Sequence, residues 1–119
     1  MKKKRIPIAD DEKAVRISLA EALKPYGYNI DVVENGIEAI SHINRRAYDL
    51  IITDYMMPKM DGLELIRRIR SKYPSIPILI ITGGGPECDL LKSGATACIK
   101  KPFNILELQN MVKVILLRN

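Results

Sequence analysis

Short apolar runs alternate along the chain with amphipathic stretches. The five runs that predict strands cover residues 5–9, 28–33, 50–53, 77–81 and 95–100. The third and fourth runs are continuous and rich in β-branched residues, which is typical of parallel strands covered on both faces. The second run alternates polar with apolar residues, so it is predicted to be an edge strand.

Apolar residues recur at helical spacing between the predicted strands, which indicates helices that pack on a sheet. The three clearest stripes, interpreted as core, are Val15, Leu19, Ala22, Leu23 and Tyr26, then Ile37, Ile40 and Ile43, then Ile66, Ile69 and Tyr73. Capping-box patterns predict three helix starts, at Asn35 with Glu38, Asp61 with Glu64, and Asn104 with Glu107.

Strict alternation of strands and helices predicts an α/β fold. Right-handed crossovers turn such a chain into a doubly wound, five-stranded parallel sheet flanked by helices. Sites in these sheets lie beyond the carboxyl ends of the strands.

The length of 119 residues and the 47% hydrophobic content fit one domain with a single core. No stretch approaches the ~20 apolar residues of a membrane helix, and the basic start lacks the apolar run of a signal peptide. We therefore expect a cytoplasmic protein without membrane association. Cys88 and Cys98 lack metal-site spacing, so reduced thiols are expected.

The net charge of +5 raises the possibility of nucleic-acid binding. The cations, however, are weakly clustered. Those at positions 2–5 are expected to form a frayed arm, and those at positions 67–72 suit the end of a helix. Aromatic interleaving and finger motifs are absent from the sequence, so no direct nucleic-acid binding is expected.

Polar side chains that can bind a metal ion or a phosphate group follow four of the predicted strands. Asp10 and Asp11 follow the first strand, Asp54 the third, Thr82 the fourth and Lys101 the fifth. Because the carboxyl ends of parallel strands share one edge of a sheet, these side chains should converge there.

Three carboxylates at one edge are costly without a ligand. Two carboxylates about 5 Å apart repel by roughly 3 kcal/mol at an effective dielectric near 20, and one lysine cannot offset three of them. Oxygen ligation by few protein groups suits Mg²⁺, which is often shared with a phosphate. The set therefore predicts a phosphoryl-transfer site, where positioning and charge neutralisation do most of the catalysis.

The motifs that contain these residues resemble the signature of response-regulator receiver domains. They are Ile8-Ala9-Asp10-Asp11-Glu12, Asp54-Tyr55-Met56-Met57-Pro58 with Asp61-Gly62, then Thr82, and Lys101-Pro102-Phe103. The resemblance covers the whole chain and implies one receiver domain over residues 1–119. It also implies the strand order 2-1-3-4-5 of flavodoxin-like folds.

The same resemblance implies that Asp54 accepts a phosphoryl group from a sensor histidine kinase or a phosphotransfer protein. Thr82 and Lys101 would bind the phosphoryl oxygens. The Mg²⁺ ligands would be Asp11, Asp54 and the Met56 carbonyl, with Asp10 acting through water. The chain would be a phosphoacceptor signalling domain and not an enzyme acting on a separate substrate.

Several positions depart from the family pattern. The distance from Thr82 to Lys101 is about three positions short, and glycines with a proline at 83–86 discourage helix, so we expect a short fourth helix over residues 87–93. Cys98 stands where many receivers carry a switch aromatic residue. Pro7 falls inside an interior strand and removes one hydrogen-bond donor. The Lys101–Pro102 bond is expected to be cis.

Three other functions share some of these sequence features. A phosphatase of the haloacid-dehalogenase type would resemble D-x-D, but Met56 occupies the second acidic position. A nucleotide-binding loop at Gly83 to Gly85 lacks the following G-K-[ST]. A receiver-like interaction module that works without phosphorylation stays open, because the loop and Cys98 are altered.

The chain ends soon after the last predicted helix, so we expect no output domain, either in a stand-alone regulator or in a fragment. A downstream protein target is expected. Val114 and Leu117 add apolar groups outside the core-facing stripe of that helix. With Lys113 and Lys100 as a polar rim, they are predicted to form a partner or homodimer interface that phosphorylation strengthens.

Overall fold

Five parallel strands form one sheet in the computed structural model, which describes residues 3–83 and 94–118. The strands are β1 (Arg5–Ala9), β2 (Asn29–Val33), β3 (Ile51–Asp54), β4 (Ile78–Thr82) and β5 (Ala97–Lys100). Their order β2-β1-β3-β4-β5 confirms the predicted topology. Each predicted strand is found within two residues of its expected bounds.

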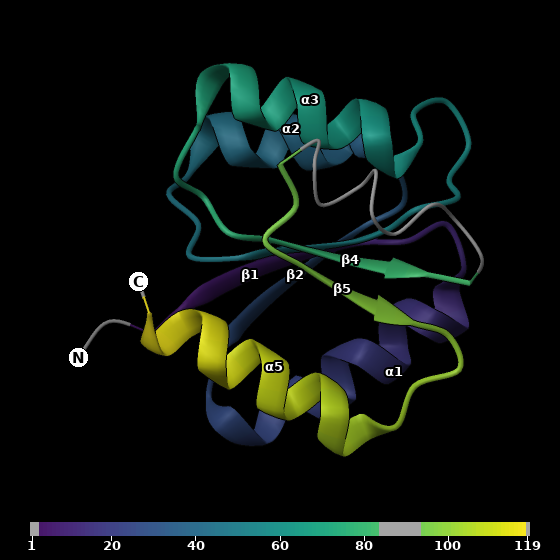
Figure 1. The fold of residues 1–119 in the computed structure, drawn as a ribbon, viewed down its shortest axis with the longest axis vertical. Helices are drawn as coiled ribbons and strands as arrows, with labels where there is room; N and C mark the ends of the chain where they lie inside the picture. Colours follow the sequence, from purple (N-terminus) through teal and green to yellow (C-terminus); the bar gives the residue numbers. More distant parts are fainter. Residues whose placement is uncertain (1–2, 84–93, 119) are drawn as a thin grey trace.

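Helices cover both faces of the sheet. They are α1 (Lys13–Leu23), α2 (Gly36–Arg45), α3 (Gly62–Lys72) and α5 (Ile105–Leu117), with a 3-10 turn η1 (Lys24–Tyr26) after α1. Figure 1 shows α2 and α3 on one face and α1 and α5 on the other. The predicted fourth helix over residues 87–93 lies outside the described residues. Within the described residues, no helix is long and apolar enough to cross a membrane.

The N-cap half of each of the three predicted capping boxes is present. The side chains of Asn35, Asp61 and Asn104 accept hydrogen bonds from the backbone amides three residues later, at 2.6 to 2.9 Å. Each of these bonds satisfies one of the amides left unpaired in the first turn of a helix. The starts of α2, α3 and α5 are therefore fixed locally, by the sequence itself.

The apolar side chains form one core on each face of the sheet. The cluster under α1 and α5 includes Leu19, Leu23 and Leu108, whereas the cluster under α2 and α3 includes Ile43 and Leu65. β3 and β4 are buried at every position, as their continuous apolar runs predict.

Two residues of the predicted core stripes are exposed. Ile37 is 53% exposed and Tyr26 is 39% exposed. Ile37 belongs to the first turn of α2, and Tyr26 belongs to η1 beyond the end of α1. Helical spacing alone therefore extends each stripe one turn too far.

Pro7 lies inside β1 and cannot donate a hydrogen bond to the sheet. Lys4 and Asp10 form backbone hydrogen bonds with β2, so by alternation the nitrogen of Pro7 faces β3. The pairing of β1 with β3 begins only at Ile8. The donor that proline lacks falls just before this register, next to the Arg5 carbonyl, which accepts a hydrogen bond from the Asp49 amide at 2.9 Å.

The expectation of a frayed basic arm is wrong for Lys4 and Arg5. Arg5 is the first residue of β1, and the Lys4 carbonyl accepts a hydrogen bond from the Asn29 amide at 2.8 Å. The first residue of β2, Asn29, pairs with Arg5 and binds the Lys4 carbonyl, so both residues are held at the edge of the sheet. Lys2 lies outside the described residues.

Candidate functional site

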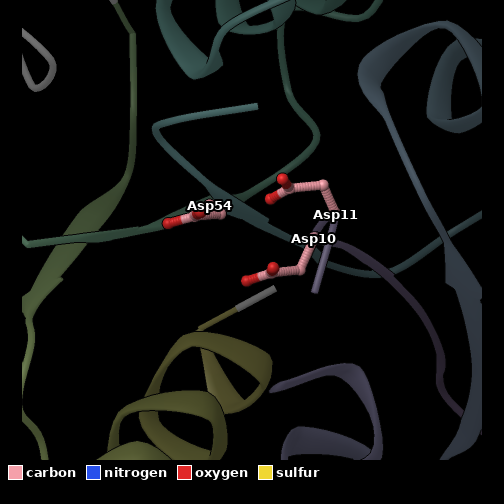
Figure 2. A group of neighbouring side chains, drawn as sticks. All are labelled: Asp10, Asp11 and Asp54. Carbon is pink, nitrogen blue, oxygen red and sulfur yellow. The ribbon is translucent and has the colours of Figure 1, made fainter. Parts of the chain in front are cut away.

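Three carboxylates meet at the carboxyl edge of the sheet, as the strand ends predict. Asp10 and Asp11 directly follow β1, and Asp54 ends the neighbouring strand β3. One oxygen from each carboxylate lies within 4.8 Å of the others. Figure 2 shows these side chains gathered around one small volume.

Asp10 is the most enclosed of the three, with only 1% of its surface exposed. Its Oδ1 accepts a hydrogen bond from the Glu12 amide at 2.9 Å, while its buried Oδ2 has no hydrogen-bond partner in the described structure. Burial raises the pKa of Asp10, and the nearby charge of Asp54 raises this pKa further. A buried, unpaired carboxylate oxygen is the kind of ligand atom that a cation would satisfy.

Asp54 is also buried, at 6% exposure, and forms an ion pair. The Lys101 Nζ lies 3.1 Å from the Asp54 Oδ1. Burial raises the pKa of Asp54, although the Lys101 ammonium opposes this rise. One ammonium therefore faces three carboxylates, and the donor set fits a divalent cation of the Mg²⁺ type, with hard oxygen ligands.

Backbone pairing places Thr82 and Lys101 next to Asp54. Asp54 pairs with Ile81 of β4, so Thr82 lies one residue beyond this pair. The Thr82 carbonyl accepts a hydrogen bond from the Lys101 amide at 2.7 Å. The Lys101–Pro102 bond that follows is cis, as predicted. All five of the predicted strand-end residues are thus brought to one edge.

The β3–α3 loop depends on a glycine that the sequence analysis left without a role. A Cβ on Gly62 would lie 2.9 Å from the Tyr55 Cα and 3.0 Å from the Asp54 carbonyl oxygen. The Gly62 amide donates to the Tyr55 carbonyl at 2.7 Å. Close backbone approach therefore requires glycine here, and the Asp61-Gly62 pair in the sequence was the signal.

Met56, a predicted ligand through its carbonyl, lies in the same loop two residues after Asp54. Its side chain is 69% exposed. The part of Met56 that could bind a cation is therefore its backbone carbonyl.

Two further residues with reactive side chains, Cys98 and His42, belong to β5 and α2. Cys98 is half-buried in β5 and packs against the core under α2 and α3. His42 is half-buried, and its Nδ1 lies 3.4 Å from the Tyr48 hydroxyl. Tyr48 in turn donates to Asp31 at 2.6 Å. Cys88 lies outside the described residues.

Comparison with known proteins places this fold and site in context. The family model for the response regulator receiver domain matches residues 6–113. The response regulator MprA of Mycobacterium leprae is 36% identical over 117 residues, which is 96% of this chain and 51% of that protein. The chain thus spans about half the length of the curated relatives it matches.

Solved structures agree with this assignment. The receiver domain of the Francisella response regulator 1452 has a TM-score of 0.92 and 30% identity, with 98% of both chains covered. The chemotaxis protein CheY4 of Vibrio cholerae has a TM-score of 0.87 and 28% identity, with 96% of this chain and 99% of that chain covered. The chain therefore belongs to the response regulator receiver family, the signalling domains of two-component systems.

Proposed function

We propose that this domain accepts a phosphoryl group on Asp54 from the phosphohistidine of a sensor histidine kinase or a phosphotransfer protein. The observation that carries the proposal is the ion pair of the buried Asp54 with Lys101, beside the unpaired buried oxygen of Asp10. Membership of the family supports it.

In the proposed reaction, an Asp54 carboxylate oxygen attacks phosphorus. An O–P bond forms as the N–P bond of the phosphohistidine breaks, and the imidazole nitrogen leaves with the electron pair of that bond. Lys101 and Thr82 would hold two phosphoryl oxygens, in a transfer where charge neutralisation and positioning dominate.

The proposed metal ligands are Asp10, Asp11, Asp54 and the Met56 carbonyl, with Asp10 acting through water. Mg²⁺ bound there would neutralise negative charge on the carboxylates and on the incoming phosphoryl group. Its requirement follows from the charge balance at this edge, where a single ammonium faces three acids.

The proposed readout surface is on α5. Val114 is 47% exposed and Leu117 is 81% exposed, in agreement with their place outside the core-facing stripe. Lys113 and Lys100 are also exposed, and Lys113 lies over the ring of Tyr26. Phosphorylation would strengthen the binding of a downstream target or a second copy at this surface.

The test is labelling with acetyl phosphate or with a phosphorylated kinase domain. We expect hydroxylamine-sensitive, Mg²⁺-dependent labelling of the parent and background labelling of Asp54→Asn. Asp61→Asn is the matched control, because Asp61 is an exposed acid in the same loop and asparagine preserves its helix cap. This variant should label like the parent.

Undiminished labelling of Asp54→Asn would refute the acceptor assignment. Absence of labelling in the folded parent with several donors would favour the other function considered, an interaction module that works without phosphorylation.

A further inference from the structure

The amino-terminal edge of the sheet, remote from the carboxylates, carries a cavity of about 490 Å³ whose walls are mostly cationic. Its lining residues are Lys3, Lys4, Arg5, Asn29, Arg46, Ala47 and Asp49. They come from the starts of β1 and β2 and from the loop before β3. Figure 1 shows β1, in purple, beginning on the side of the molecule away from the arrowheads of β4 and β5.

The fold holds the backbone of this cationic wall in place. The Lys4 carbonyl accepts a hydrogen bond from the Asn29 amide at 2.8 Å, and the Arg5 amide donates to the Asp49 Oδ2 at 2.8 Å. The cations therefore project from an ordered sheet edge, and a ligand would not have to order a free tail.

The cations of the cavity outnumber the acids. Asp49 is the one carboxylate among the lining residues, and its Oδ1 lies 3.9 Å from the Lys4 Nζ. In the described part of the chain, Lys3, Arg5 and Arg46 form no ion pair.

The negative end of the dipole of α2 does not neutralise this excess of cations. The carboxyl end of α2, next to Arg46, adds only about half a negative charge. Four cations against Asp49 and this helix end leave an excess of about two to three positive charges. This excess matches a small multivalent anion.

A second cavity of about 400 Å³ adjoins the first and shares Lys4 and Asp49 with it. Two tyrosines, Tyr48 and Tyr73, line it together with Pro74, Ile76 and Pro77. The Tyr73 hydroxyl donates to the Asn44 Oδ1 at 2.7 Å, which fixes the ring. Tyr48 is buried, whereas Tyr73 is half-buried and has the Lys72 Nζ 5.6 Å from its ring centroid, so a planar base would lie against the prolines and the edge of this ring–cation pair.

We propose that the two cavities form a second ligand site, for a small molecule with a diphosphate group. Two linked phosphates carry two to three negative charges near neutral pH, which matches the excess of the cationic wall. Two kinds of ligand contain this diphosphate group. One is inorganic pyrophosphate alone, and the other is a nucleoside diphosphate whose base occupies the neighbouring cavity.

Titration calorimetry of the full chain with pyrophosphate, ADP and adenosine, in Mg²⁺-free buffer at low salt, tests the site. The Lys4→Gln, Arg46→Gln double variant removes two exposed cations of the wall. The Arg67→Gln, Arg68→Gln double variant removes the same charge from the exposed face of α3 and is the matched control. Both are surface changes, so thermal melts should show intact folds.

We expect the parent to bind the diphosphate. The affinity should fall at least tenfold in the Lys4→Gln, Arg46→Gln variant. It should be unchanged in the Arg67→Gln, Arg68→Gln control and in Asp54→Asn. Tighter binding of ADP than of pyrophosphate identifies the nucleotide as the source, and equal affinity identifies the diphosphate alone. Binding of neither compound overturns the proposal, as does equal loss in both double variants. Since Asp54→Asn keeps this site intact, a failure of phosphoryl labelling leaves the result unaffected.

Discussion

At the residue scale, the strongest feature of the molecule is a carboxylate whose environment opposes its charge. The Asp10 Oδ2 is buried without a hydrogen-bond partner in the described structure, and Asp54 and Asp11 both lie nearby. Such an arrangement lowers the stability of the metal-free fold, because a buried unsatisfied group costs about 1–3 kcal/mol.

Asp10→Asn should therefore raise the free energy of unfolding of the metal-free protein, by about 1–2 kcal/mol. The variant removes one negative charge, and its amide can donate to a neighbouring carboxylate. Urea denaturation in EDTA measures this, with Asp61→Asn as an exposed control that should change stability little. A less stable Asp10→Asn protein would contradict this account of the site.

A second residue-scale prediction concerns Tyr48. Burial and the hydrogen bond to Asp31 raise the pKa of Tyr48 to about 12 from its usual 10.0. Tyr48→Phe loses a hydrogen bond to a charged acceptor and should lower the free energy of unfolding by about 1.5–3 kcal/mol.

The contribution of the Tyr48 hydroxyl to the free energy of unfolding falls at high pH. Because the phenol pKa is higher in the folded state, its contribution is fully present below pH 10.0 and is lost as the pH rises through about 12. Denaturation curves of the parent and of Tyr48→Phe should therefore converge across this interval. Tyr55→Phe is the control, since the Tyr55 hydroxyl forms no hydrogen bond among the described residues. Curves that stay parallel to pH 12 would refute the assignment.

At the scale of elements, α5 has a buried face and an exposed apolar one. Leu108, Val112 and Ile115 pack on the sheet, whereas Val114 and Leu117 face solvent. The core does not include Val114 and Leu117. Substitutions at these two positions therefore test the surface without disturbing core packing.

The Val114→Asp, Leu117→Asp double variant should keep the parent's thermal stability to within a few degrees but lose association in the beryllofluoride-activated state. Analytical ultracentrifugation and target pull-down, with and without beryllofluoride, measure this. Lys113→Gln, Lys100→Gln is the companion variant and should weaken association only partly, since rim charges contribute little. If the aspartate variant associates like the parent in both states, the interface lies elsewhere.

At the scale of the whole molecule, the two edges of the sheet have opposite electrostatic character. Acids gather at the carboxyl edge, and cations line the cavity at the amino edge. A cation that binds only the folded acidic edge shifts the folding equilibrium of the entire domain.

Mg²⁺ at about one hundred times its dissociation constant should therefore stabilise the protein by about 2.7 kcal/mol. The Asp11→Asn, Asp54→Asn double variant should lose this gain, because two of the proposed ligands become neutral. Chemical denaturation at constant ionic strength measures the difference. An equal Mg²⁺ effect in the double variant would show a general salt effect and no site.

The sequence by itself determined the features that depend on local chemistry and periodicity. Continuous β-branched runs placed β3 and β4 in the interior, and the capping side chains of Asn35, Asp61 and Asn104 fixed three helix starts. Strand ends share one edge in any parallel sheet, so Asp10, Asp11, Asp54, Thr82 and Lys101 could be grouped before any coordinates were known.

Only the tertiary structure decided features that depend on distant neighbours. Ile37 is exposed although it has helical spacing, because no element in the described part of the chain covers the first turn of α2 at that point. Lys4 is ordered because Asn29 pairs with it across 25 positions of sequence. The requirement for Gly62 comes from the approach of the Tyr55 backbone. Periodicity reports which residues can share a face, whereas burial and pairing depend on what packs against that face in three dimensions.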